Sequence, residues 1–329
     1  MELEYDSAKN LWKPLKQGYQ ESLKYLQGRQ QGLITSLKTP WDKVNDATID
    51  GFEWHNMIVV GARPGCGKTV FKDQLIKESF ILNPNDEFRV LDFQLEMLAR
   101  ASAIRQYSSE LGLSYKELCS AEGKLSKTDL QRCLQFAKSA INNPVDIIEN
   151  PPTVFEFANI IKRYMSEFKK KTYTKTLITV DHSILLKRAS GQKHMDMLYD
   201  FGEICTKLKR LYPITFLILS QLNRDINRPE RNEEGKYGNY ILDSDIFGAD
   251  ALLQHADAVI GLDIPAKRKL RIYGPDKYII DSEQVMAMHF LKLRNGDPRM
   301  SFFKAAFNKM RIEAGTAPAQ MEIKSNNYH

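Results

Sequence analysis

The segment Ala62–Thr69 constrains this sequence more than any other part, because an apolar run leads into it and a helical pattern leaves it. It reads Ala-Arg-Pro-Gly-Cys-Gly-Lys-Thr, the phosphate-loop pattern with Ala62 in place of the first glycine. A turn of small residues lets successive backbone N–H groups point at phosphate oxygens, and the following helix adds the positive end of its dipole. Lys68 adds a cation, and the Thr69 hydroxyl suits Mg²⁺. The strand–loop–helix context disfavours the alternative, a glycine-rich turn that binds nothing. The predicted phosphate site consists of Ala62, Arg63, Pro64, Gly65, Cys66, Gly67, Lys68 and Thr69.

Near-continuous apolar runs alternate with helical patterns along the rest of the chain. Runs of this kind are typical of parallel strands that are covered on both faces. The predicted fold is therefore α/β, a P-loop core with a mostly parallel twisted sheet and helices on both faces. Helical stripes are expected over Phe157–Phe168 and Phe201–Leu211. The predicted strands are His55–Gly61, Phe88–Gln94, Val145–Glu149, Leu177–Asp181, Ile214–Ser220, Ala256–Leu262, Gln284–Leu293 and Ser301–Phe307.

Residues 1–32 are predicted to form an amphipathic helix ahead of a single domain that spans residues 33–329. Its apolar residues recur at steps of three and four, so they share one stripe. Such a stripe packs either on its own domain or on a neighbouring subunit, and periodicity alone favours neither. The stripe consists of Trp12, Leu15, Tyr19, Leu23 and Leu26.

Composition and charge indicate a globular protein of the cytoplasm. The 329 residues are 43% hydrophobic and include 47 Lys and Arg against 41 Asp and Glu, so the net charge is +6. That excess permits a polyanionic partner without requiring one. The four cysteines show neither a CxxC pair nor a zinc-ligand spacing, as expected for reduced thiols. The acidic N-terminus lacks the apolar stretch of a signal peptide, and no apolar run is long enough to cross a membrane.

Three polar side chains follow predicted strands and are expected at the edge of the sheet where the phosphate loop lies. Asp181 ends a buried strand and needs a cation, which is either a Mg²⁺ shared with Thr69 or a Lys or Arg in a salt bridge. Glu96 is placed either to polarise an attacking water or to stabilise a helix start. Gln221 is a candidate sensor of the γ-phosphate, on a weak signal. Two long polar segments, residues 187–195 and 225–240, should open on the same edge.

Seven segments together resemble the RecA-like ATPase domain of DnaB-type replicative helicases, and the resemblance covers residues 32–312. The Ser-Gln-Leu-Asn-Arg and Lys-Leu-Arg-Asn-Gly segments are far more specific than the phosphate loop alone. The segments are Ala62–Thr69, Gln94–Met97, Val180–Asp181, Leu219–Arg224, Ser244–Asp245, Ala256–Asp257 and Lys292–Gly296.

The resemblance assigns roles to the candidate residues. Glu96 would be the catalytic glutamate, Asp181 would hold Mg²⁺, and Gln221 would couple the γ-phosphate to a DNA-binding loop. Lys292 and Arg294 would reach the ATP of the adjacent subunit, and residues two apart on a strand do share a face. The resemblance also implies a ring of six subunits, joined by the N-terminal helix of each, with 5′-to-3′ movement on single-stranded DNA. Helicase loaders and primase are the implied partners. The expected DNA contacts are Lys187, Arg188, Lys193, Arg224, Arg228, Arg231 and Lys236.

The sequence also departs from this family. The family's N-terminal helical domain has no counterpart in it. His182 stands where an aromatic residue is usual, Asp92 where an apolar one is usual, and Phe247 where an arginine is frequent. The expected activity is an ATP- and Mg²⁺-dependent DNA helicase motor. Two alternatives are a RecA-like recombinase or mediator, and a non-unwinding ATPase that binds a full-length helicase.

Overall fold

The computed structural model describes residues 12–168, 175–232 and 238–321, and the chain divides into two compact units at Ser36. In the first unit, α1 (Leu15–Gln30) lies within the predicted helix of residues 1–32, and residues 1–11 of that prediction lie outside the described residues. Gly28 near its end is buried, and a Cβ there would lie 2.6 Å from Ile34, so the chain turns tightly after the helix. The apolar stripe is exposed, from 56% for Leu26 to 80% for Trp12.

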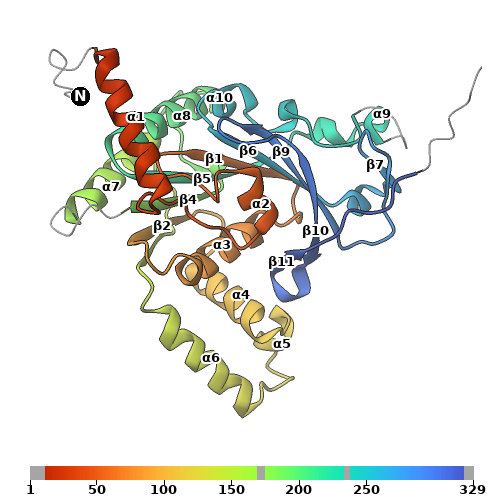
Figure 1. Ribbon diagram of the computed structural model, residues 1–329. Coiled ribbons are helices and arrows are strands. Elements are labelled where there is room, and N and C mark those ends of the chain that lie inside the picture. Colours follow the sequence, from red (N-terminus) through yellow and green to blue (C-terminus); the bar gives the residue numbers. More distant parts are fainter. Residues whose placement is uncertain (1–11, 169–174, 233–237, 322–329) are drawn as a thin grey trace, which may run out of the picture. The chain divides into compact units, whose positions relative to one another are not determined.

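The second unit is built on a nine-stranded sheet with the order β11-β10-β9-β6-β1-β5-β4-β2-β3 (Figure 1). The strands from β3 to β6 in this order run parallel, and β9, β10 and β11 continue the sheet antiparallel. β1 lies in the middle of the sheet between β5 and β6, and the strand order continues in opposite directions on its two sides. The carboxyl end of a strand at such a switch point is where open α/β sheets bind ligands. The strands are β1 (Met57–Ala62), β2 (Phe88–Gln94), β3 (Val145–Ile148), β4 (Lys175–Asp181), β5 (Ile214–Gln221), β6 (Ala258–Asp263), β9 (Val285–Leu293), β10 (Met300–Ala306) and β11 (Arg311–Ala314).

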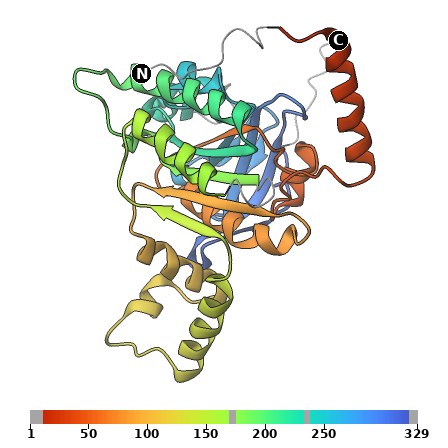
Figure 2. The ribbon, with the colours of Figure 1, turned by 90° about the vertical axis from the view of Figure 1, so that its left-hand side faces the viewer.

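Helices cover both faces of this sheet, as Figure 2 shows for the green α7 and α8 on one side and the orange α3 on the other. No helix in the described part of the chain is long and apolar enough to cross a membrane. The longer helices are α3 (Lys68–Leu82), α4 (Ala99–Leu111), α6 (Lys127–Ala140), α7 (Val154–Glu167) and α8 (His194–Leu211), and the shorter ones are α2 (Asp42–Ala47), α5 (Tyr115–Cys119), α9 (Pro229–Asn232) and α10 (Ala249–Leu253).

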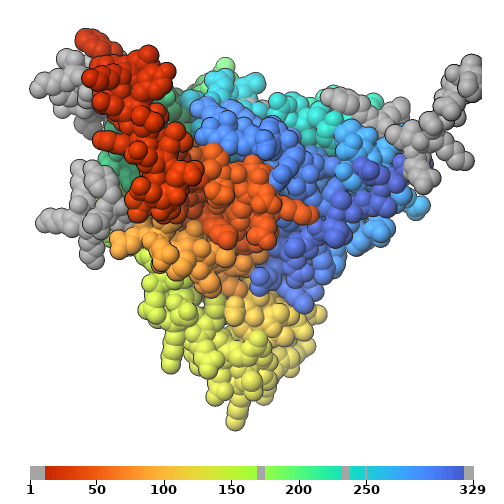
Figure 3. Space-filling view, viewed as in Figure 1, coloured from red at the N-terminus to blue at the C-terminus, as the bar shows by residue number. Residues whose placement is uncertain are grey.

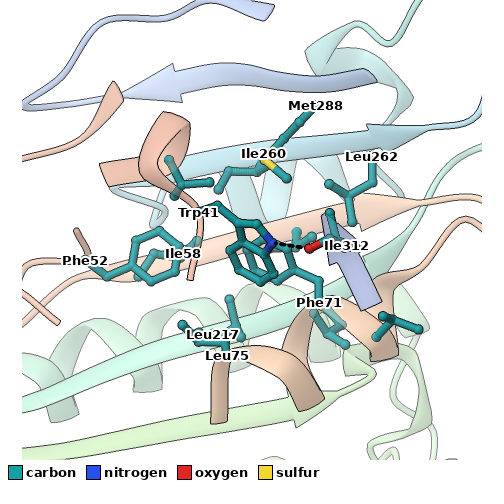
Figure 4. Close-up of a cluster of buried hydrophobic side chains, with 14 of the residues drawn as sticks. Trp41, Phe52, Ile58, Phe71, Leu75, Leu217, Ile260, Leu262, Met288 and Ile312 are labelled. Atoms are coloured by element: carbon teal, nitrogen blue, oxygen red, sulfur yellow. Dashed lines mark hydrogen bonds between the residues drawn. The ribbon is translucent and has the colours of Figure 1, made fainter. Parts of the chain in front are cut away.

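Side chains that alternate along the strands form two separate cores. In β1, Ile58 and Val60 join the core beneath α2 and α3, whereas Met57 and Val59 join the core beneath α7 and α8. In the first of these cores Trp41 stacks on Phe71 of α3 with ring centroids 4.3 Å apart (Figure 4). Its indole nitrogen donates to the Ile312 carbonyl at 3.0 Å, which fastens β11 to the same core.

All eight predicted strands are confirmed, but the structure also contains elements that were not predicted. The hairpin of β7 (Ile272–Tyr273) and β8 (Tyr278–Ile279) forms a separate small sheet. Helices α4, α5 and α6 are inserted between β2 and β3 and stand out from the sheet as the yellow segment in Figure 3. One face of α6 packs on α4, where Phe136 meets Tyr107 edge-on at 5.8 Å. Its other face leaves Leu130 and Leu134 more than half exposed.

Candidate nucleotide-binding site

The phosphate loop connects the end of β1 to the start of α3, as predicted. Gly65 and Gly67 have φ angles of +74° and +93°, which glycine adopts without steric cost. A Cβ on Gly67 would also lie 2.4 Å from the ring of Phe307. Lys267 donates to the Gly65 carbonyl at 2.5 Å, so a residue far along the chain helps to hold the loop in place. Left-handed glycines in such a turn produce the nest of N–H groups that binds anions.

Lys68 lies at the first position of α3 and is buried, with its Nζ donating to the Ala62 carbonyl at 3.3 Å. Burial lowers the pKa of Lys68, and the carboxylates of Asp181 and Glu96 oppose that shift. Thr69 is half-buried in the same helical turn. Cys66 is buried within the loop, and burial raises the pKa of its thiol. The phosphate site therefore has a cation and a hydroxyl beside the turn, and its thiol is protonated.

Asp181 has one carboxylate oxygen near a lysine and one without a partner. Its Oδ2 lies 3.8 Å from Lys72 Nζ, so the salt-bridge alternative for this residue is observed in part. Its Oδ1 is buried and accepts no hydrogen bond. An unpartnered buried carboxylate oxygen is costly, and it is a ligand that Mg²⁺ prefers. Thr69 and Asp181 therefore fit a Mg²⁺ that arrives with a nucleotide.

Lys72 explains the carboxylate of Asp92 in an otherwise apolar strand. Lys72 Nζ lies 2.9 Å from Asp92 Oδ2 and 3.3 Å from Asp73 Oδ1, and its side chain is 2% exposed. Asp92 also accepts hydrogen bonds from Thr179 at 2.5 Å and from Gln94 at 2.7 Å. This departure from the family pattern is thus part of a buried ionic network around a lysine one helical turn beyond Lys68.

Glu96 lies beside the nucleotide site, and His182 connects it to Gln221. The N–H of Leu95 donates to the Asp181 carbonyl at 2.9 Å, which holds the segment leading to Glu96 against the end of β4. His182 Nε2 lies 3.9 Å from Glu96 Oε2 and 3.3 Å from Gln221 Nε2. Burial and the Lys68 charge lower the pKa of His182, so its ring is neutral at pH 7. The structure thus brings Glu96, Asp181 and Gln221 to one edge of the sheet.

Gln221 is bonded directly to the loop that follows β5. The Phe247 N–H donates to the Gln221 carbonyl at 2.8 Å. Phe247, which stands where an arginine is frequent in the family, therefore contacts Gln221 through its backbone. Arg231 is placed differently from its predicted role. Its guanidinium pairs with the buried carboxylate of Asp245 and donates to the Gly238 carbonyl at 2.7 Å. Arg231 therefore braces the loop, and we do not retain it among the DNA contacts.

The other predicted DNA contacts are exposed where the structure describes them. Lys187, Arg188 and Lys193 line one open hollow in the loop after β4. Arg224 and Arg228 lie in the loop after β5, and Arg228 pairs with an exposed aspartate. The two loops meet where His194 packs edge-on against Phe247, with centroids 5.8 Å apart. Lys236 lies outside the described residues.

Lys292 and Arg294 lie at the other end of the strands from the phosphate loop of their own chain. The Arg294 N–H donates to the Asp257 carbonyl at 2.9 Å, and its Nη1 lies 3.3 Å from Asp257 Oδ1. Asp257 Oδ2 accepts the N–H of Met57, the first residue of β1. Lys292 Nζ donates to the Leu253 carbonyl at 2.6 Å. Because β1 is six residues long, the phosphate loop begins roughly 16 Å from this contact.

Sequence reasoning did not assign Lys72 or Lys267 to the site. Lys72 follows Lys68 at the helical spacing of four, so both lie on the same face of the helix. Asp92 is a lone aspartate in an apolar strand and implies a buried cation, so the pair of Lys72 and Asp92 had a detectable sequence signal. Lys267 has no such signal, because it reaches the phosphate loop from 202 residues away in the chain.

The parallel sheet, the phosphate loop after β1 and the carboxylate at the end of β4 define a RecA-like P-loop protein. The chain belongs to the DnaB-like helicase C terminal domain family, which it matches over residues 36–310. It is 27% identical to the replicative DNA helicase DnaB of Geobacillus stearothermophilus, over 88% of this chain and 58% of that protein. It is 26% identical to the replicative DNA helicase DnaC of Bacillus subtilis (strain 168), over 81% of this chain and 54% of that protein.

Two solved structures share the fold. The ATPase domain of G40P aligns with a TM-score of 0.74 at 16% identity, over 89% of this chain and 97% of that one. A DnaB-like replicative helicase, described with its interactions with primase, aligns with a TM-score of 0.72 at 16% identity, over 89% of this chain and 66% of that one. The chain spans a little over half the length of the curated relatives it matches.

Proposed function

We propose that this chain is the motor of a ring-forming DNA helicase of the cytoplasm, which hydrolyses ATP between subunits, moves along single-stranded DNA and separates the duplex. The position of Arg294 carries the proposal. It lies level with Met57 at one end of β1, whereas the phosphate loop follows Ala62 at the other end. Arg294 is out of reach of the nucleotide of its own chain, and its side chain is exposed on the surface that we propose a neighbouring subunit meets. We retain six subunits as the expected ring size and 5′-to-3′ as the expected polarity.

Each residue of the site has a distinct part in the proposed hydrolysis. The glycine turn and Lys68 hold the phosphates of ATP, and Thr69 and Asp181 are the ligands for Mg²⁺, which supplies charge neutralisation when it is bound. Glu96 orients the attacking water and accepts its proton. Arg294 of the next subunit, with Lys292 beside it, stabilises the charge that develops on the transferred phosphoryl group. Water attack in line with the leaving oxygen then needs residues of two chains.

The loops after β4 and β5 are the proposed contacts with single-stranded DNA. The open hollow of Lys187, Arg188 and Lys193 offers cations to phosphates without reading bases. Gln221 is the last residue of β5 and its backbone carbonyl accepts the N–H of Phe247, so the candidate sensor and the loop after β5 are joined through the backbone. This connection supports the coupling of ATP turnover to movement along DNA.

Two exposed apolar stripes support assembly into a ring. One is the stripe of α1, and the other is the outer face of α6 with Leu130, Leu134 and Ile141, which are 53–78% exposed. Apolar faces of this kind on a monomer indicate an interaction surface. We propose that α1 of one subunit docks on the next subunit at α6. A helicase loader and primase are the further partners we propose for the assembled ring.

Solution mass and DNA unwinding measured on the same sample test this proposal. With ATP, Mg²⁺ and single-stranded DNA, the chain should assemble into a closed oligomer that separates a forked duplex. The Lys68→Ala variant is the matched control, and it should assemble without hydrolysing ATP. ATP hydrolysis without unwinding at any concentration would favour the alternative of a non-unwinding partner of a full-length helicase. Strand pairing by open filaments would favour a recombinase.

A further inference from the structure

His182 occupies the position between the candidate general base and the candidate phosphate sensor. Its Nε2 lies 3.9 Å from Glu96 Oε2 and 3.3 Å from Gln221 Nε2. The ring is enclosed, with 6% of the side chain exposed, and its other nitrogen, Nδ1, is buried without a hydrogen-bond partner. Glu96 is 55% exposed and therefore free to close the short remaining distance.

A space-filling role does not account for a histidine at this position. An aromatic hydrocarbon ring of similar size would fill the same volume, and it would not leave a ring nitrogen buried without a partner. An unsatisfied buried polar atom destabilises a fold. The choice of an imidazole therefore indicates a use for Nε2, the nitrogen that faces Glu96 and Gln221.

One ring nitrogen cannot serve both neighbours at once. In a neutral imidazole, Nε2 carries either a lone pair that accepts the Gln221 amide N–H or a hydrogen that donates to the Glu96 carboxylate. If the Gln221 amide is turned so that its oxygen faces the ring, the single hydrogen on Nε2 still has one strong acceptor at a time. The two contacts therefore exclude each other in either orientation of the amide.

We propose that His182 is a positioning residue that couples Gln221 to Glu96. This inference rests on the proposed ATPase function. While Gln221 engages Nε2, Glu96 is without its hydrogen-bond partner. The hydrogen stays on Nε2 throughout: it donates to the Gln221 amide oxygen while that oxygen faces the ring, and when the amide turns to a γ-phosphate it donates to Glu96 and fixes the carboxylate for the attacking water. The general base is then in position only while a triphosphate is present, which ties the hydrolytic step to the sensor that moves the DNA-binding loop.

A double-mutant cycle between His182 and Glu96 tests this positioning role. His182→Phe keeps the ring volume and loses the hydrogen bond, whereas His182→Gln keeps a donor and an acceptor. For the assembled chain with single-stranded DNA and ATP, His182→Phe should lower kcat about tenfold, as expected for losing a hydrogen bond to a charged group. The KM for ATP should change less than about twofold, and His182→Gln should restore most of kcat. In a Glu96→Ala background, His182→Phe should have little further effect on the residual kcat, because positioning Glu96 is its part in the step.

Several outcomes would overturn the inference. These are an equal loss in both backgrounds, an equal loss for His182→Phe and His182→Gln, or a change confined to KM. Melting temperature and binding of a fluorescent ATP analogue show whether each variant folds, and His182→Tyr replaces His182→Phe if the latter does not. If the wild type hydrolyses ATP and Lys68→Ala does not, additive His182 effects refute this inference alone. A wild type without ATPase activity would refute the proposed function together with it.

Discussion

Replacing Lys72 with methionine removes the cation at the centre of the buried ionic network beside the nucleotide site. Lys72 Nζ lies 2.9 Å from Asp92, 3.3 Å from Asp73 and 3.8 Å from Asp181, and its side chain is 2% exposed. In Lys72→Met the three carboxylates would share this enclosed space without a positive charge. The carboxylates would then repel one another, and the Asp92 charge would be buried without compensation.

The expected loss of stability differs between the two partners, because the network has one lysine and three carboxylates. Removing one partner of a buried ion pair costs about 3–5 kcal/mol. Asp92→Asn should cost less, about 1–2 kcal/mol, because the amide oxygen still accepts from Thr179 and the lysine keeps Asp73 and Asp181. For a domain of this size each kcal/mol shifts the melting temperature by about 2 °C. Lys72→Met should therefore melt about 6–10 °C below the wild type, and Asp92→Asn about 2–4 °C below it.

Thermal unfolding followed by circular dichroism at pH 7.5 without Mg²⁺ measures these shifts. Lys207→Met on α8 is the control, because Lys207 is 49% exposed and pairs at 2.7 Å with a glutamate that is 58% exposed. Exposed pairs contribute about 0–1 kcal/mol, so the control should lose no more than about 2 °C. A loss for Lys72→Met no larger than that of the control, or smaller than that of Asp92→Asn, would refute the reasoning.

Three further predictions concern charge, thiol reactivity and DNA. Burial raises the pKa of Asp73 from 3.8 to about 6, so the folded state holds this proton more tightly than the unfolded state and loses stability as the pH rises from 3.8 to about 6. Asp73→Asn should therefore raise the melting temperature at pH 7.5 and raise it less at pH 5, and an equal gain at both pH values would contradict the assignment. Cys119 is exposed and Cys66 is buried with a raised pKa, so peptide mass spectrometry should find Cys119 alkylated first at pH 7.5, and the reverse order would show that the phosphate loop opens. Affinity for single-stranded DNA should fall with salt, and Lys187→Ala should reduce the slope of log affinity against log salt by about 0.7, whereas an unchanged slope would remove Lys187 from the contacts.

The parallel strands and the phosphate loop were predictable because their signals are local. A strand such as Ile214–Gln221 is a continuous apolar run, and Gly-Lys-Thr after such a run has few structural meanings. The missed elements lack such signals. β7 and β8 are two residues each, and β11 is four residues long, two of them charged.

The identities of the site residues were predictable, but most of their partners were not. The order of the strands brings Glu96, Asp181 and Gln221 to one edge, and a parallel sheet implies this without coordinates. The contacts of Arg231 with Asp245 and of Arg294 with Asp257 depend on how loops return to the sheet. No local sequence pattern indicates where a loop comes back to contact the sheet. Arg231, a basic residue in a polar loop, was therefore expected to contact DNA, but it pairs with Asp245 and holds the loop together.

The central claim is that each ATP is hydrolysed between two subunits, and complementation of two inactive variants tests it most directly. Lys68→Ala disables the phosphate site and Arg294→Ala disables the residue offered to the neighbour. Each variant alone should be inactive, although Arg294→Ala should still bind ATP. In an equal mixture about a quarter of the interfaces combine an intact phosphate site with an intact Arg294, so the ATPase rate should recover to about that fraction of the wild type. A mixture no more active than its two components, with mixed oligomers demonstrated, would contradict the account.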